Sequence, residues 1–129
     1  MTIRVASLLA VLILLAGCGT YASPPGQPCS PAYAAPKKYG RLAVQQAGPG
    51  KPIHWGAYPA KKYQGDLYDV EVFLDGRSAG GGKPQPYPPH GSVGAQRAKK
   101  YSGKTFEMRG RVESGGKLVF NFTLYCTVA

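Results

Sequence analysis

Apolar and polar side chains alternate along residues 68–74. The apolar positions are Tyr68, Val70, Val72 and Leu74, and the polar residues Asp69 and Glu71 lie between them. Successive side chains of a β-strand point to opposite faces of its sheet, so this spacing predicts a strand with one buried and one exposed face.

The same alternation recurs twice near the C-terminus. In residues 106–113 the apolar positions are Phe106, Met108 and Val112, and the charged positions are Glu107, Arg109, Arg111 and Glu113. Residues 118–128 are apolar at every even position, and the sequence Ser-Gly-Gly-Lys at 114–117 joins the two stretches. Because adjacent glycines favour a tight turn, the sequence predicts a β-hairpin here.

Two further strands are expected in the first half of the chain, over residues 41–46 and 53–58, the second of which contains His54 and Trp55. No stretch shows the periodicity and caps of a helix. We therefore expect an all-β domain of about five antiparallel strands, arranged as a small sandwich or a partly open barrel.

A long connection without periodicity, residues 76–98, interrupts this pattern. It contains three consecutive glycines at 80–82 and a proline-rich stretch at 84–91. The glycines favour a hinge, and the prolines favour an extended conformation that would present Tyr87 and His90 as binding residues. Both a mobile spacer and a recognition loop fit this composition, and the spacer is the favoured interpretation.

The start of the chain has a different character. Arg4 is followed by a largely apolar run over residues 5–16, which ends in Leu-Ala-Gly-Cys at residues 15–18. A charged start, a short apolar stretch and a small-residue cleavage site are typical of a secretory signal peptide, and the run is too short to span a bilayer comfortably.

The end of this run resembles the lipobox of bacterial lipoproteins, a resemblance that covers the signal alone. It implies that residues 1–17 are removed and that Cys18 receives fatty acyl chains such as palmitate, which hold the protein at a membrane. Gly19 follows Cys18 where Asp would favour the inner membrane, so the analogy with Gram-negative sorting implies the outer membrane, on its periplasmic side. A plain secretory signal with an incidental Cys and an uncut membrane anchor are the alternatives.

With Cys18 acylated, Cys29 and Cys126 are left in an oxidising compartment, and we expect them to form one disulfide. Closing nearly the whole domain into a loop would contribute roughly 4 kcal/mol in the chain-entropy description. Two unpaired thiols are the alternative. Neither a metal nor a cofactor is expected, because the cysteines and histidines show no recognised ligand spacing.

The expected organisation has three parts. A signal peptide covers residues 1–17, a lipidated Cys and Pro-rich tether covers 18–36, and the β domain covers 37–129. The tether from Cys18 to Cys29 would reach at most about 35 Å, so the domain would stay close to its membrane.

The chain is strongly cationic, with 16 Lys and Arg against 6 Asp and Glu and a net charge of +10. At an envelope, such a surface favours anionic partners: lipid headgroups, lipopolysaccharide, wall polymers, acidic proteins or DNA. No glycine-rich phosphate-binding motif accompanies the charge, so specific nucleic-acid or nucleotide binding is not expected. The charge could equally serve solubility alone.

A short segment is repeated in the chain. Residues 60–70 align without gaps with residues 98–108, and residues 36–40 are a shorter third copy. The candidate binding residues of the two long copies are Lys61, Lys62, Tyr63, Lys99, Lys100 and Tyr101. Lysine pairs beside aromatic rings suit phosphate or sugar binding if the copies meet at one end of the domain. Soluble turns with half-buried tyrosines are the favoured alternative.

The sequence offers little support for catalysis. Asp69 and Glu71 would lie about 7 Å apart on one strand face, a spacing that a carboxylate pair could use. Arg109 and Arg111 occupy corresponding exposed positions on another strand, so ion pairing across strands explains these carboxylates more simply. Neither histidine lies in a nucleophile motif. We therefore expect a protein that is not an enzyme.

Three classes of function remain. The favoured one is a membrane-anchored binding module whose basic surface engages an anionic envelope polymer or an acidic protein. The second is a periplasmic inhibitor or immunity protein that inserts the connection at 83–91 into an enzyme or toxin. The third is a structural subunit of an envelope assembly, for which the polar face of residues 121–127 would be a docking surface. Nothing in the sequence indicates an oligomeric state.

Overall fold

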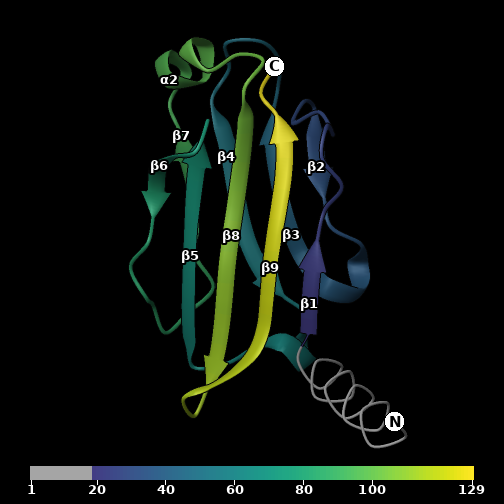
Figure 1. The fold of residues 1–129 in the computed structure, drawn as a ribbon, viewed down its shortest axis with the longest axis vertical. Helices are drawn as coiled ribbons and strands as arrows, with labels where there is room; N and C mark the ends of the chain where they lie inside the picture. The colour runs from purple at the N-terminus through teal and green to yellow at the C-terminus, as the bar shows by residue number, and fades with distance from the viewer. Residues whose placement is uncertain (1–18) are drawn as a thin grey trace, which may run out of the picture.

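The computed structural model describes residues 19–129, so the predicted signal peptide and the predicted lipidation of Cys18 lie outside the described residues. Two β-sheets stack face to face (Figure 1). The five-stranded sheet has the order β1 (Gly19–Ala22), β9 (Lys117–Thr127), β8 (Thr105–Ser114), β5 (Leu67–Leu74) and β6 (Arg77–Gly81). The four-stranded sheet has the order β2 (Ala32–Ala34), β3 (Gly40–Gln46), β4 (Ile53–Pro59) and β7 (His90–Val93).

The predicted all-β class and sandwich arrangement are confirmed, and the sandwich is built mostly from antiparallel pairs. The apolar positions predicted in β5 and β8 are buried between the sheets, together with Phe120, Phe122 and Leu124 of β9. The structure has more strands than the five or so expected, because β1, β2, β6 and β7 are only three to five residues long and show no periodicity. The pairing of β1 with β9 is parallel.

One glycine allows close packing between the two longest strands, β8 and β9. Gly110 lies on the buried face of β8, directly opposite Phe122 of β9. A Cβ atom at position 110 would collide with the Phe122 ring. The missing side chain therefore provides the space that this ring occupies.

Residues 19–36 do not form the expected tether. Gly19–Ala22 pairs with β9, the Cys29 amide donates to the Thr127 carbonyl at 3.0 Å, and Ala32–Ala34 pairs with β3. Backbone hydrogen bonds hold this segment along the edges of both sheets, and they do not depend on an apolar pattern that could be read from the sequence.

The connection over residues 76–98 is also part of the fold. It contains β6, β7 and the start of a short helix, α2 (Ala95–Lys100). The Gly82 amide donates to the Val70 carbonyl at 2.8 Å, so the three glycines lie along β5 and do not act as a free hinge. The proline-rich stretch is held by backbone hydrogen bonds between Gln85 and Tyr68, 2.7 and 2.8 Å long.

Three helical turns were absent from the sequence prediction: α2, η1 (Lys37–Tyr39) and η2 (Lys61–Tyr63). They are too short to show helical periodicity, and α2 buries Ala98 alone. Within residues 19–129, no helix combines the length and the apolar character needed to cross a membrane.

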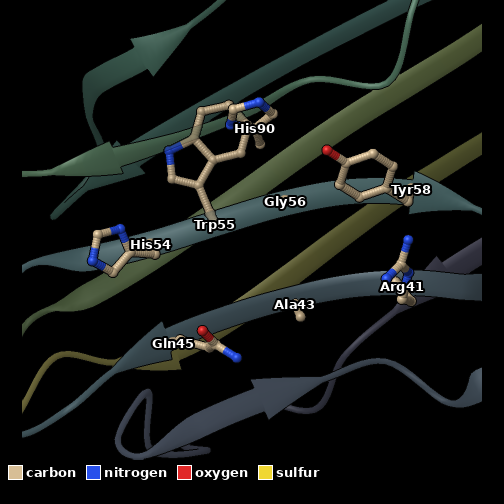
Figure 2. Close-up of a pocket in the computed structure, with 8 residues that line it drawn as sticks. All are labelled: Arg41, Ala43, Gln45, His54, Trp55, Gly56, Tyr58 and His90. Carbon is tan, nitrogen blue, oxygen red and sulfur yellow. The ribbon is translucent and has the colours of Figure 1, made fainter.

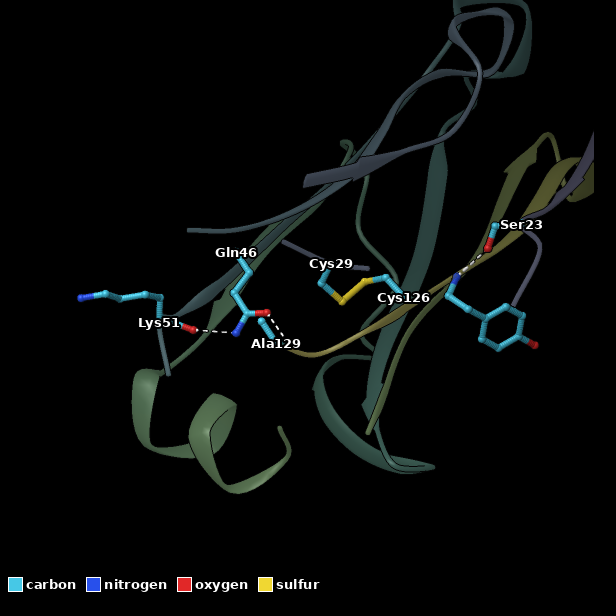
Figure 3. The surroundings of a disulfide bond; sticks show 7 residues. Ser23, Cys29, Gln46, Lys51, Cys126 and Ala129 are labelled. Carbon is cyan, nitrogen blue, oxygen red and sulfur yellow. Dashed lines mark hydrogen bonds between the residues drawn. A yellow bond between two sulfur atoms is a disulfide. The ribbon is translucent and has the colours of Figure 1, made fainter. Parts of the chain in front are cut away.

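The predicted disulfide between Cys29 and Cys126 is confirmed, with Cα atoms 4.9 Å apart and both residues buried. It fastens the chain to β9 just before the chain crosses from the five-stranded sheet to β2 (Figure 3). Nearby, the buried Gln46 side chain accepts from the Ala129 amide at 2.9 Å and donates to the Lys51 carbonyl at 3.2 Å. Both sheets are thus tied to the C-terminal end of the chain.

Candidate functional site

Charge is divided unequally between the two sheets. All six acidic residues of the chain lie on β5 and β8 or immediately beside β5: Asp66, Asp69, Glu71, Asp75, Glu107 and Glu113. The four-stranded sheet, its turns and the three helices contain none. Their cationic side chains are Lys37, Lys38, Arg41, Lys51, Lys61, Lys62, Arg97, Lys99 and Lys100. Anions are therefore attracted to this part of the molecule without opposing carboxylates.

The outer face of the four-stranded sheet contains a shallow hollow of about 240 Å³ (Figure 2). Its floor is formed by Ala43 of β3 and Gly56 of β4, which pair directly. Because these residues have the smallest side chains, the surface is low between the larger pairs on either side. We call this the basic hollow, lined by Arg41, Ala43, Gln45, His54, Trp55, Gly56, Tyr58 and His90.

Strand register determines which side chains surround the floor. Arg41 pairs with Tyr58 at one end, and Gln45 pairs with His54 at the other. His90 of β7 lies opposite Gly56 and completes the third side. The outward positions of three strands thus converge, while Trp55, the alternate residue of β4, is buried.

Arg41 and Tyr58 form the end of the hollow with the clearest chemistry. The guanidinium carbon of Arg41 lies 5.2 Å from the centroid of the Tyr58 ring, a cation–π distance. Tyr58 is 38% exposed, and in residues 19–129 it is one of two exposed large apolar side chains, with Tyr87 at 60%. The Arg41 guanidinium can donate several hydrogen bonds to an anionic group, and the Tyr58 ring and the flat floor can contact an apolar surface. This end of the hollow therefore suits a ligand that has both an anionic group and a flat apolar face.

Both histidines of the chain, His54 and His90, line this hollow. Each is exposed, and no carboxylate or cysteine accompanies them there. Across the described part of the chain, residues 19–129, His, Cys, Asp and Glu form no group of three or more that could hold a metal ion. The histidines are therefore available as hydrogen-bonding groups.

The structure brings together two of the three lysine pairs. Lys37 and Lys38 lie on η1, Lys61 and Lys62 lie on η2, and the Ala60 amide donates to the Tyr39 carbonyl at 2.9 Å. The two turns are neighbours because η1 precedes β3 and η2 follows its antiparallel partner β4.

The third pair lies elsewhere. Lys99 and Lys100 are on α2, which follows β7 at the opposite end of the sandwich (Figure 1). The candidate residues Lys61, Lys62 and Tyr63 are thus far from Lys99, Lys100 and Tyr101. The single cluster of three loops that phosphate or sugar binding would need does not form. The direction of β7, antiparallel to β4, places its C-terminal end away from η2.

All three repeats share a local arrangement. Each tyrosine, Tyr39, Tyr63 or Tyr101, is half-buried against the core, and the preceding lysine amine lies 5.0 to 5.7 Å from its ring centroid. This agrees with tyrosines that cover the edge of the core while lysines keep the turns soluble.

Tyr39 and Tyr63 belong to a larger aromatic group, which we call the tyrosine cluster: Tyr21, Tyr39, Tyr63 and Phe120. The ring of Phe120 is stacked 4.5 Å from Tyr63, and Tyr39 lies 4.9 Å from Tyr21 and 6.0 Å from Tyr63. Burial and a 3.3 Å hydrogen bond with the Tyr33 hydroxyl raise the pKa of Tyr21 above its usual range. Tyr21 therefore stays neutral at ordinary pH.

The remaining predicted residues are separated from these groups. Tyr87 is exposed in the connection between β6 and β7, whereas His90 lines the basic hollow. Sequence reasoning missed Arg41, Gln45 and Tyr58. Their outward positions on two predicted strands could be read from the sequence. Only the pairing of those strands shows that the three residues lie together.

We predicted that Asp69 and Glu71 form ion pairs with arginines on another strand. The strand register is as predicted, but these ion pairs do not form. Asp69 lies opposite Arg111 and Glu71 opposite Arg109. Arg109 instead bonds Glu107 on its own strand at 2.9 Å, and the Ser78 hydroxyl donates to Glu71 at 2.6 Å. The Arg109 guanidinium also lies 4.8 Å from the Phe73 ring, which favours the intrastrand position.

No protein-family model, curated protein or solved structure matches this chain. The charge and geometry of the basic hollow and of the lysine turns are therefore the features of the described residues that indicate a function.

Proposed function

We propose that this protein is a lipoprotein, anchored through Cys18 in the outer membrane on its periplasmic side, that acts as a non-enzymatic binding module of the cell envelope. Its basic hollow engages an anionic polymer. The observation that carries this proposal is the charge division, because every acidic side chain lies on or beside the five-stranded sheet and the charged side chains of the four-stranded sheet are all cationic.

The shape and chemistry of the hollow favour a particular way of binding. Arg41 donates hydrogen bonds to an acidic group of the polymer, and the flat face of a sugar ring lies over Ala43 and Gly56 beside Tyr58.

A binding role is favoured over a catalytic one by where the acidic groups lie. The carboxylates that general acid–base chemistry would use lie on or beside the five-stranded sheet, and none lines the hollow. Its histidines have no Ser, Thr, Cys, Asp or Glu beside them among the lining residues.

The first test compares two polymers with one backbone. The full-length mature protein in detergent is titrated with dextran sulfate and with uncharged dextran, at low and at moderate salt. We expect binding to dextran sulfate alone, weakening as salt rises because the attraction is screened over about 8 to 10 Å. Equal binding to both polymers, or none to either, would contradict the proposal.

Matched arginine substitutions locate the site. Arg41→Glu and Arg111→Glu change the net charge equally, and both residues are exposed, one on each sheet. We expect Arg41→Glu to weaken dextran sulfate binding roughly tenfold or more, as expected for a charge-assisted contact. Arg111→Glu should change it little. Equal effects would show that net charge, and not the hollow, determines binding.

An inhibitor or immunity role is the second candidate, and Tyr87 favours it. The chain is fixed on both sides of this residue, by the Gln85–Tyr68 hydrogen bonds and by the Ala57 amide, which donates to the Pro89 carbonyl at 3.0 Å. A rigid loop with an exposed aromatic side chain suits insertion into a cleft. Capture of one protein from an envelope extract at moderate salt, abolished by Tyr87→Ala and unaffected by Arg41→Glu, would support this role over polymer binding.

A further inference from the structure

The first strand, β1, begins in contact with the η2 lysine turn. Gly19 pairs with Phe120 of β9, and the Tyr63 ring packs so closely over Gly19 that a Cβ atom there would collide with it. Cys18 is bonded to Gly19, and neighbouring Cα atoms are about 3.8 Å apart. Any lipid on Cys18 therefore enters its membrane next to η2.

The tyrosine cluster holds the two lysine turns at this end. Tyr39 of η1 and Tyr63 of η2 stack on each other and on Phe120, at centroid distances of 4.5 to 6.0 Å. The amines of Lys38 and Lys62 lie 5.1 and 5.0 Å from the rings of their neighbouring tyrosines. Because the tyrosines are fixed by packing, the lysine stems are held in place while their amines remain exposed.

We propose that the end of the sandwich formed by η1 and η2 binds the headgroups of anionic phospholipids in the anchoring membrane. Lys37, Lys38, Lys61 and Lys62 contact the lipid phosphates, with α2 at the far end of the domain. This inference rests on the proposed lipid anchor at Cys18.

Distance and charge together favour phospholipid as the occupant of this surface. The Cα atoms of Gly19 and Cys18 are about 3.8 Å apart, which is less than the screening length of about 8 to 10 Å, so the lysine turns next to Gly19 remain within the field of the bilayer. Each lysine near an anionic leaflet favours contact roughly fivefold. Half-buried tyrosines suit the boundary between lipid and water.

Two carboxylates lie at the same end of the sandwich, and neither belongs to the lysine turns. Asp66 accepts a 3.0 Å hydrogen bond from the Gly115 amide, and Glu113 is half-buried near the end of β8. The exposed surface of η1 and η2 is therefore cationic.

The rate of lysine acetylation measures which end of the sandwich contacts the membrane. The full-length mature protein is reconstituted in vesicles of phosphatidylcholine, with or without phosphatidylglycerol, and the modification rate of each lysine is measured by mass spectrometry. We expect phosphatidylglycerol to slow modification of Lys37, Lys38, Lys61 and Lys62 about fivefold. Lys99 and Lys100, which have the same local motif at the opposite end, are the internal control and should change little.

Charge reversal provides the matched variants. In one variant Lys61 and Lys62 become Glu, and in the other Lys99 and Lys100 become Glu, so the net charge is equal. The first should abolish the slowing at Lys37 and Lys38, and the second should leave it intact. Thermal unfolding checks that both fold, and glutamine at the same positions replaces glutamate if either does not.

The outcomes separate this inference from the proposed function. Equal modification with and without phosphatidylglycerol, or slowing at Lys99 and Lys100 instead, would overturn the headgroup contact while leaving the anchor and the polymer site intact. An intact mass without lipid, or failure to float with vesicles, would overturn the anchor itself. Slowing that survives the Lys61 and Lys62 variant would overturn the role of these turns.

Discussion

The two sheets share one core but differ on their outer faces. The outer face of the five-stranded sheet has both acidic and basic residues, and Arg109 forms a salt bridge with Glu107 of its own strand. The four-stranded sheet has cations, both histidines and a hollow floored by Ala43 and Gly56. The inner faces follow the same alternation of buried residues, so packing constrains both sheets equally. The outer faces are free of that constraint, and their difference therefore points to function.

Removing the disulfide should have the largest effect, because it fastens the chain where it passes from one sheet to the other. Replacing both Cys29 and Cys126 with Ser should lower the free energy of unfolding by about 2 to 5 kcal/mol. Urea denaturation of the oxidised protein and the variant measures the difference. A loss below about 1 kcal/mol would mean that the Gln46 and backbone hydrogen bonds hold the sheets together without the disulfide.

Alanine substitutions at Gly110 on an inner face and at Gly56 on an outer face test the difference between the two faces. Gly110→Ala should destabilise the protein by about 1 to 3 kcal/mol, because the new methyl group collides with the Phe122 ring in the core. Gly56→Ala should change stability by less than about 0.5 kcal/mol, as expected for a surface position. Its Cβ would lie 3.4 Å from the Tyr58 ring, in ordinary contact.

The same pair separates stability from binding. Gly56→Ala raises the floor of the basic hollow, so it should weaken dextran sulfate binding while the melting temperature stays unchanged. Weaker binding by Gly110→Ala at a temperature where it is fully folded would show that binding depends on the core and not on the hollow.

The tyrosine cluster connects the edge strand β1 to the turns η1 and η2 of the other sheet. Its residue Tyr21 predicts that stability depends on pH. Because the pKa of Tyr21 is raised in the folded state, its contribution to stability is complete below the ordinary tyrosine pKa of about 10 and is lost as pH rises further. Tyr21→Phe should cost about 1 kcal/mol at neutral pH through loss of the hydrogen bond with Tyr33, and should reduce the alkaline loss. Unfolding measured at several pH values, with Tyr125→Phe as a control, tests the assignment.

The smallest effect is expected on the outer face of the five-stranded sheet. Glu107→Gln removes the salt bridge with Arg109, whose side chain is 60% exposed. Exposed ion pairs contribute about 0.2 to 1 kcal/mol, so the loss should fall in this range and shrink at high salt. Chemical denaturation at two salt concentrations measures it. A salt-independent loss would indicate that Glu107 acts through packing instead.

The long strands could be predicted because each buries one complete face. Residues 68–74 and 118–128 alternate over enough positions to identify both the strand and its inner side. The edge strands β1 and β2 could not be predicted, since a strand of three or four residues is specified by its partner's hydrogen bonds and not by its own side chains. The segment assigned to a tether became part of the fold for this reason.

The candidate site was predicted less completely than the fold. The lysine–tyrosine repeats and His90 were visible in the sequence, but Arg41 and Tyr58 belong to the hollow only through the pairing of β3 with β4. Likewise, the repeats were visible as three equivalent copies. Strand direction makes two of them neighbours and places the third at the opposite end.

The sequence by itself determined the all-β class, the inward faces of the long strands and the cationic character, and it predicted the pairing of Cys29 with Cys126 once the lipobox resemblance had set Cys18 aside. These properties depend on local alternation, composition and the number of cysteines. Only the tertiary structure decided the division of charge between two sheets, the basic hollow and the proximity of η1, η2 and Gly19. Those features depend on which distant strands pair and in which direction they run, and the side chains of a single strand do not record its partner.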